Sequence, residues 1–220
     1  MDVHASEKEQ VEALRKWWKE NGSSVVTGVL LGLSVLLGTK AWQSYQERQT
    51  LNASNLYAQL LAFSNEDSAD ENTVGQVQTL ANQLLTDHSG SVYASLAALV
   101  LAKQAVEQGE LDAARAQLQW AIDHADSVEI VNTARSRLIR LLIDQAMYDE
   151  AASRLDAVQD PGAYAHRYSE LRGDLEAARG EPAAAAKAYR QALDQLPAGA
   201  ANLVVLTAKY ESVGGGGETP

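Results

Sequence analysis

Residues 23–39 read SSVVTGVLLGLSVLLGT, and no charged residue lies between Glu20 and Lys40. As an α-helix, the 19 residues between those two charges would extend about 28 Å, close to the ~30 Å hydrocarbon core of a bilayer. Aromatic side chains flank both ends, as expected at the two membrane–water interfaces: Trp17, Trp18, Trp42 and Tyr45. This pattern predicts one transmembrane helix at residues 23–42.

Two glycines one turn apart, Gly28 and Gly32, lie within the predicted span. A small-xxx-small spacing lets a second helix approach closely along that face. We therefore consider Gly28 and Gly32 as a helix-packing site. The alternative is ordinary membrane-helix composition, because glycine is frequent in spanning helices.

A cleavable signal peptide is the main alternative to a retained anchor. Signal peptides have a short basic segment before the apolar core and a small-residue cleavage site just after it. Here residues 1–22 are largely charged, and the nearby candidate, Thr39-Lys40-Ala41, has an unsuitable first residue. A retained signal-anchor is the favoured interpretation.

The distribution of basic residues predicts the orientation of the anchor. Four basic side chains precede the span and two follow it, which favours a cytoplasmic N-terminus: Lys8, Arg15, Lys16 and Lys19, against Lys40 and Arg48. Residues 43–220 are then expected outside the cytoplasm.

Residues 1–22 are expected to form a cytoplasmic amphipathic segment. Ser6 and Glu9 have the spacing of a capping box at a helix start, and Val11, Leu14 and Trp18 share one face. The pattern predicts a short helix at the inner membrane surface that ends at residues 21–22, Asn-Gly. For the first five residues, a solvated arm is an equal alternative.

Residues 43–220 are long enough for one domain with its own core. They are rich in Ala, Leu and Gln, which predicts an all-helical domain. With 18 − 5 = 13 basic and 29 − 5 = 24 acidic groups, they carry the whole net charge of −11. Such a surface argues against nucleic-acid binding. The chain has no cysteine, which excludes disulfides and thiol catalysis.

Helical spacing of apolar residues continues from residue 51 to Phe63, and a loop is expected over residues 64–72. A second helix is predicted at residues 74–85, with Val77, Leu80, Leu84 and Leu85 on its buried side.

From residue 91 onward the chain repeats itself. Ala114, Ala151 and Ala185 occupy equivalent positions 37 and 34 residues apart, a period typical of an α-solenoid. Each is followed on the same helix face by a larger residue and then by a small one or a valine: Leu118 and Ala121, Leu155 and Val158, Tyr189 and Ala192. The small residue is expected to let the two helices of each pair approach.

These repeats resemble tetratricopeptide repeats over residues 95–197. The segment QAMYDEA (145–151) is a close match to that family's turn, and GELD (109–112) and GEP (180–182) fill the corresponding turns. The first helix of the last repeat departs from the pattern, because the family places large residues at the positions of Ser169, Arg172 and Glu176. A rotation or a one-residue shift is expected there. A final helix at residues 200–213, with Leu203, Leu206 and Tyr210 buried, would cover the end of the stack, and residues 214–220 form a tail.

No catalytic constellation is visible in the sequence. The four histidines are far apart, and no phosphate loop, GxSxG elbow or dinucleotide fingerprint is present. We expect no enzyme activity, cofactor, metal or small-molecule substrate.

The resemblance implies a concave groove lined by the first helix of each pair. The family's groove positions correspond to Leu96, Leu99, Val100 and Lys103, then Arg137 and Arg140, then Arg167. An apolar floor beside arginines suits an extended, partly apolar peptide with a carboxylate. For the apolar residues the favoured alternative is packing against the preceding helix pair.

In the order of its charged N-terminal segment, its anchor and its repeats, the chain resembles the bacterial YfgM-like family, whose members are ancillary subunits of the SecYEG translocon. The resemblance rests on EQVEALRKWWKENG (9–22), the anchor ending in Lys-Ala-Trp (40–42), VYASLAAL (92–99) and LRGDLEAARGEPAAAAKAYRQAL (171–193). It implies a single-pass inner-membrane protein with a periplasmic repeat domain at residues 43–213. The implied partners are the translocon, a PpiD-type chaperone and unfolded polypeptide clients passed to periplasmic chaperones.

Two other functions stay open. The chain could be a structural scaffold of an envelope complex, or a regulator that sequesters a cytoplasmic partner through residues 1–22.

Overall fold

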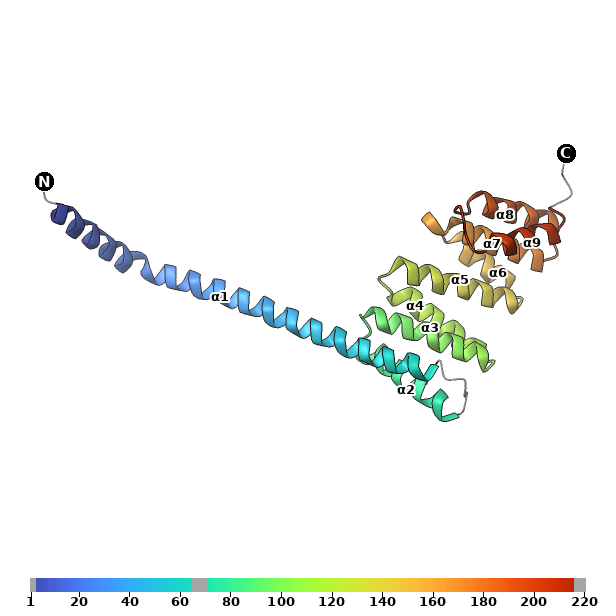
Figure 1. Cartoon of the computed structure of the whole chain (residues 1–220), viewed down its shortest axis with the longest axis horizontal. Helices are drawn as coiled ribbons and strands as arrows, with labels where there is room; N and C mark the ends of the chain where they lie inside the picture. The colour runs from blue at the N-terminus through green and yellow to red at the C-terminus, as the bar shows by residue number, and fades with distance from the viewer. Residues whose placement is uncertain (1–2, 65–70, 216–220) are drawn as a thin grey trace. The chain divides into compact units, whose positions relative to one another are not determined.

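The computed structural model describes residues 3–64 and 71–215. Every regular element in these residues is a helix, and no described residue lies in a β-strand (Figure 1). The chain divides into two compact units, Met1–Asn52 and Ala53–Pro220. The all-α prediction is confirmed.

The first unit consists of most of α1, Val3–Ser64. This helix is long and apolar enough, by length and composition, to cross a membrane. Most apolar side chains of its predicted span are exposed: Leu36 and Leu37, for example, are 62% and 67% exposed. Because so many exposed apolar groups are unfavourable in water, the helix matches the predicted anchor.

The predicted helix end at Asn21 and Gly22 is wrong, because α1 continues through both residues. The Asn21 side chain donates to the carbonyl oxygen of Trp17 at 3.2 Å, within the same helix. The Trp18 ring covers Gly22, where an added Cβ would lie 3.2 Å from the ring. The helix therefore continues at a position where the Asn-Gly pair alone indicates a stop, and the Trp18 ring covers its backbone there.

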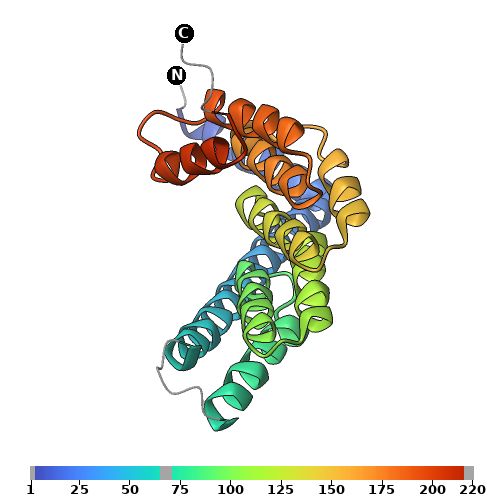
Figure 2. The same cartoon turned by 90° about the vertical axis from the view of Figure 1, so that its right-hand side faces the viewer.

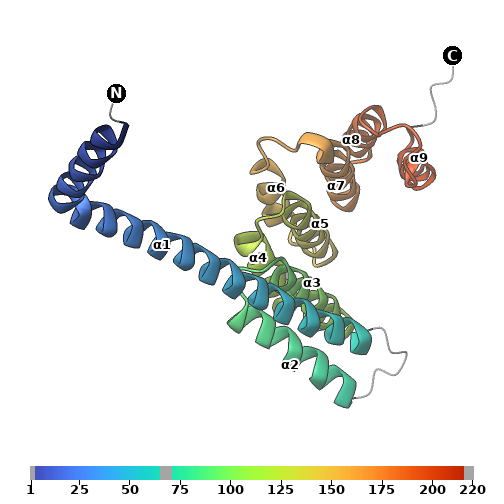
Figure 3. The ribbon, with the colours of Figure 1, turned by 60° about the vertical axis from the view of Figure 1, so that its left-hand side comes forward.

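The second unit begins with the last turns of α1, as the continued helical spacing predicted. Ala53 and Leu60 are buried against α2, Glu71–Asp87, where Val77 and Leu84 are buried and Ala81 joins them. Figure 3 shows α2 beside this end of α1. The helix is longer than the predicted 74–85, and most of the predicted loop lies outside the described residues.

Helix pairs follow in order along the rest of this unit (Figure 2). Consecutive helices contact each other, and α5 also contacts α3 and α7. The first helices of successive pairs therefore lie next to one another. The elements are α3 Val92–Glu107, α4 Leu111–His124, α5 Val128–Asp144, α6 Tyr148–Asp156, the 3-10 turn η1 Gly162–Tyr164, α7 Ala165–Ala178, α8 Pro182–Asp194 and α9 Leu203–Ser212.

The repeat positions behave as predicted at the helix crossings. Ala114, Ala151 and Ala185 are completely buried. Their larger partners one turn later are buried as well, and so are Ala121 and Ala192. Val158 is the exception, because α6 ends at Asp156 and Val158 lies beyond it, half-buried against the core. The second repeat therefore has a shorter second helix than its sequence suggests.

The last pair shows the expected shift by one residue. Tyr168, Leu171 and Leu175 are buried, each one position before the residues named from the family pattern. The predicted last helix is shorter than expected, and Leu206 is its fully buried residue. Leu203 is 49% exposed, so its predicted burial is wrong: α9 begins at Leu203 and packs through Leu206 and Tyr210.

Candidate functional site

The predicted basic residues lie on the first helices of successive pairs. Lys103 is on α3, Arg137 and Arg140 are three residues apart on α5, and Arg167 is on α7; all four are exposed. Because α5 contacts both α3 and α7, Arg137 and Arg140 lie between the helix that carries Lys103 and the helix that carries Arg167.

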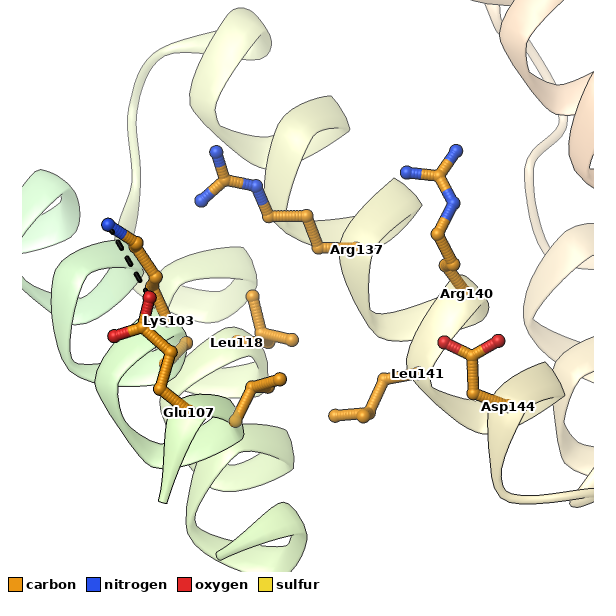
Figure 4. A pocket seen from close by; sticks show the side chains of 9 residues that line it. Lys103, Glu107, Leu118, Arg137, Arg140, Leu141 and Asp144 are labelled. Carbon is orange, nitrogen blue, oxygen red and sulfur yellow. Dashed lines mark ion pairs between the residues drawn. The ribbon is translucent and has the colours of Figure 1, made fainter. Parts of the chain in front are cut away.

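Lys103, Arg137 and Arg140 surround a cavity of about 330 Å³ between α3, α4 and α5. Its floor is apolar, formed by Ala102, Val106, Leu118 and Leu141. Figure 4 shows Leu118 and Leu141 between Lys103 on one side and the two arginines on the other. We call this cavity, with its apolar floor and its three cations, the groove.

The three cations around the groove differ in their ion pairs. Lys103 Nζ lies 3.6 Å from Glu107 Oε1, an exposed pair on one helix that contributes little to stability. Within residues 3–64 and 71–215, neither Arg137 nor Arg140 has a hydrogen bond or an ion pair. Asp144 lines the groove on the same helix as the arginines. The two guanidinium groups are therefore free to bind an anionic group.

The predicted apolar groove residues lie in the core instead. Leu99 is 8% exposed and belongs to the cluster of α3, α4 and α5, with Leu96 packed against that cluster. Val100 packs against the preceding cluster of α1, α2 and α3. Val106 and Leu141 were missed, although Val106 comes three residues after Lys103 and therefore shares its helix face.

Arg167 lies at a second cavity of about 590 Å³, between α5, α7 and the residues before α9. Arg137 and Arg140 line this cavity too, together with Ser136, His166 and Asn202. We call it the arginine hollow. It is the point at which all three predicted arginines meet.

A half-buried ionic cluster joins α7, α8 and α9 next to the hollow. Lys209 Nζ donates to Glu170 Oε1 at 2.7 Å and to Asp174 Oδ1 at 2.8 Å. The Tyr189 hydroxyl donates to Asp174 Oδ1 at 2.8 Å. Burial disfavours the charged amine, but the hydrogen bonds to the two carboxylates outweigh it and raise the pKa of Lys209. Burial, together with the hydrogen bond to Asp174, raises the pKa of Tyr189.

The predicted helix-packing glycines lie open on α1. No atom within 4 Å would contact a Cβ at Gly28 or at Gly32. In the part of the chain that the structure describes, no three His, Cys, Asp or Glu side chains are grouped to hold a metal ion.

Comparison with known proteins gives a consistent result. The family model described as tetratricopeptide repeat-like domain matches residues 15–215. An ancillary SecYEG translocon subunit of Haemophilus influenzae is 30% identical over 192 residues, covering 87% of this chain and 91% of the relative. The Escherichia coli K12 protein of the same name is 29% identical over 189 residues, covering 86% and 88%.

A more distant relative from Neisseria gonorrhoeae, also named an ancillary SecYEG translocon subunit, is 24% identical over 213 residues and is covered completely. The fold and the family match define a tetratricopeptide-repeat-like protein with a long apolar first helix. Within that class, the chain belongs to the YfgM-like family of ancillary translocon subunits.

Proposed function

We propose that this protein is a single-pass inner-membrane subunit associated with the SecYEG translocon. Its relatives carry that name, and α1 has the length and composition of a membrane span. The basic asymmetry across residues 23–42 favours a cytoplasmic segment at residues 1–22 and a periplasmic domain at residues 43–213. Of the predicted tail, residues 216–220 lie outside the described residues, and Gly214 and Gly215 are hydrogen-bonded to the last turn of α9.

A fusion at the C-terminal end tests the orientation. A reporter active only in the cytoplasm, placed after Thr219, is expected to be silent, and one active only in the periplasm is expected to work. Activity of the cytoplasmic reporter would reverse the proposed topology.

The repeat domain binds polypeptide partners through the groove. One observation carries this proposal: Lys103, Arg137 and Arg140 surround an apolar floor. Apolar side chains of an extended segment fit against Val106 and Leu141, while its carboxylates bind the free guanidinium groups. The partners proposed are a PpiD-type chaperone and polypeptides that leave the translocon, which the domain helps pass to periplasmic chaperones.

Charge reversal in the groove tests this binding. The variant Arg137→Glu/Arg140→Glu should fold normally, since exposed charges contribute only about 0–1 kcal/mol each. Capture of the chaperone should fall strongly, because each charge-assisted hydrogen bond is worth about 1.5–3 kcal/mol and reversal adds repulsion. Co-purification from intact membranes measures the loss.

Lys187→Glu/Arg190→Glu is the matched control, since both residues are exposed on α8 and the change in net charge is the same. Equal capture by both variants would remove the groove from the mechanism. The face of Gly28 and Gly32 would then be the proposed contact, and Gly28→Leu/Gly32→Leu should abolish association with the translocon.

A further inference from the structure

The arginine hollow and the groove share Arg137 and Arg140 but have different walls. The groove has an apolar floor, whereas the hollow is lined mainly by polar side chains. Arg167 lines only the hollow, and Lys103 lines only the groove. The two cavities can therefore be tested separately.

Positive charge accumulates in the hollow, which is lined by three arginines and one acidic residue. Three arginines and His166 come from α5 and α7. The acidic residue of the lining, Glu170, is already bound by Lys209 at 2.7 Å. Like charges gathered on a domain with a net charge of −11 repel one another, and a bound anion would relieve that repulsion.

A buried hydroxyl at the lining also lacks a partner. Ser136 is 3% exposed, and its Oγ has no hydrogen bond in the part of the chain that the structure describes. A buried polar group without a hydrogen bond destabilises a fold, and a bound ligand that forms the missing hydrogen bond would remove this cost. Asn202 adds an amide at the start of α9, where its side chain does not cap the helix.

We propose that the hollow binds a phosphoryl group. Donors converge on it from α5, from α7 and from the residue before α9. A carboxylate is planar and is satisfied by one guanidinium fork, whereas a phosphoryl group is tetrahedral and presents oxygens in several directions. Because the hollow shares Arg137 and Arg140 with the groove, a phosphoryl group and a peptide carboxylate would compete for these two guanidinium groups, whereas Arg167 and Lys103 each belong to one cavity.

Inorganic phosphate is the first probe. The full chain in a neutral detergent is titrated with phosphate, and its melting temperature is compared with that in sodium chloride of equal ionic strength. A ligand that binds only the folded state raises the melting temperature in a saturable way. No difference between phosphate and chloride overturns the proposal.

Two glutamine variants locate the binding. Arg167→Gln should weaken phosphate binding about tenfold or more, because it removes a charge-assisted hydrogen bond. Lys103→Gln should leave phosphate binding unchanged. Chaperone capture should show the opposite pattern, with loss in Lys103→Gln and none in Arg167→Gln. The two variants therefore distinguish a failure of the phosphate site from a failure of polypeptide binding in the groove. Equal phosphate binding by wild type and Arg167→Gln overturns the inference.

Ser136→Ala separates binding from folding. Without phosphate, the variant should melt at the same temperature as wild type or higher, because an unsatisfied hydroxyl is removed. Its phosphate affinity should fall several-fold. A variant that melts lower and binds phosphate normally would show that Ser136 has only a structural role and would contradict its part in the site.

Two soluble compounds distinguish the sources of the phosphoryl group. Glycerol phosphate is a monoester, and deacylated phosphatidylglycerol is the diester headgroup of a membrane lipid. Strong diester binding assigns the site to a lipid headgroup, and preference for phosphate and the monoester assigns it to a free solute. If acetate or a peptide carboxylate stabilises the protein as well as phosphate does, the hollow belongs to the polypeptide site and the proposal fails.

Discussion

The middle of the repeat stack and its C-terminal end fill equivalent helix crossings with residues of different size. In α3–α6 the small residue at each crossing, Ala114 or Ala151, lies on the second helix of the pair. In α7–α8 the first helix contributes a glycine, Gly173, against which the Tyr189 ring of the second helix lies. The residues at the equivalent position of α3 and α5, twelve before Ala114 and Ala151, are Ala102 and Ile139. The second helix therefore carries a large aromatic, Tyr189, where α4 and α6 carry Leu118 and Leu155. The comparison teaches that the repeat requires complementary sizes at the crossing and not a particular residue on a particular helix.

The largest expected effect comes from removing that complementarity. In Gly173→Ala, the new Cβ would lie 2.4 Å from Tyr189 Cδ1 and 2.9 Å from its Cγ. Since Cγ is close to the backbone, the ring cannot simply swing away. We expect the free energy of unfolding to fall by about 1–3 kcal/mol, the usual range for overpacking. Chemical denaturation measures it.

Gly75→Ala is the matched control, because Gly75 lies in α2 with no atom within 4 Å of the added Cβ. It should stabilise the protein by about 0.5–1 kcal/mol, the gain of alanine over glycine within a helix. Adding Tyr189→Leu to Gly173→Ala should restore part of the loss. Similar stabilities for the two alanine variants would contradict the packing of α7 against α8.

The second difference between the two regions is ionic. The middle is held mainly by an apolar cluster, whereas α9 is also attached through Lys209, whose side chain is 30% exposed. Lys209→Met should lower the free energy of unfolding by about 1–2 kcal/mol, because Glu170 and Asp174 lose their cation in a partly buried site. Thermal unfolding of Lys209→Met and of Lys187→Met, at an exposed position on α8, gives the comparison. An unchanged melting temperature in both would show that the cluster is only a surface feature.

The same cluster predicts a loss of stability in alkali. The pKa values of Tyr189 and Lys209 are raised above their ordinary values of 10.0 and 10.5, so the folded state holds both protons more tightly than the unfolded chain. Stability is then constant below about pH 10 and falls as the pH rises further, because the unfolded state loses its protons first. Tyr189→Phe should make this fall shallower. Parallel denaturation curves between pH 9 and pH 11 test the sign, and a rise in stability with pH would contradict it.

What the sequence predicted, and what it did not, follows from the range of the interactions. The membrane span could be predicted because a long stretch without charged residues is a local pattern. Ala114, Ala151 and Ala185 could be predicted because they recur with a period near 35 residues. Lys103, Arg137, Arg140 and Arg167 lie on first helices, as the family resemblance implied, while their role in binding stays a prediction.

The remaining features depend on contacts between distant segments. The ionic cluster joins Lys209 to carboxylates 35 and 39 residues away. The hollow combines Ser136 with Asn202, which no period connects. The wrong helix end at Gly22 has a different origin, because the ring that covers Gly22 belongs to Trp18, only four residues earlier on the same helix.

The smallest predicted effect concerns the turns, where the middle pair is the unusual one. Gly109, Ala146 and Gly180 occupy the same position after the first helix, with positive φ values of 76°, 56° and 78°. The hydrogen bonds match as well: the next residue in each turn, such as Met147, donates its N–H to the carbonyl oxygen five residues before it. Ala146 is therefore a non-glycine residue held in a left-handed conformation that L-residues disfavour by about 1–2 kcal/mol.

Ala146→Gly should remove this strain, while its greater freedom in the unfolded chain offsets part of the gain. We expect a net stabilisation of about 0.5–1 kcal/mol. Gly109→Ala and Gly180→Ala should each destabilise the protein by a similar or larger amount, because they introduce the same strain at turns that lack it. If Ala146→Gly destabilises instead, the side chain of Ala146 makes a contact that outweighs the backbone cost, and the three turns are not equivalent in energy despite their matching hydrogen bonds.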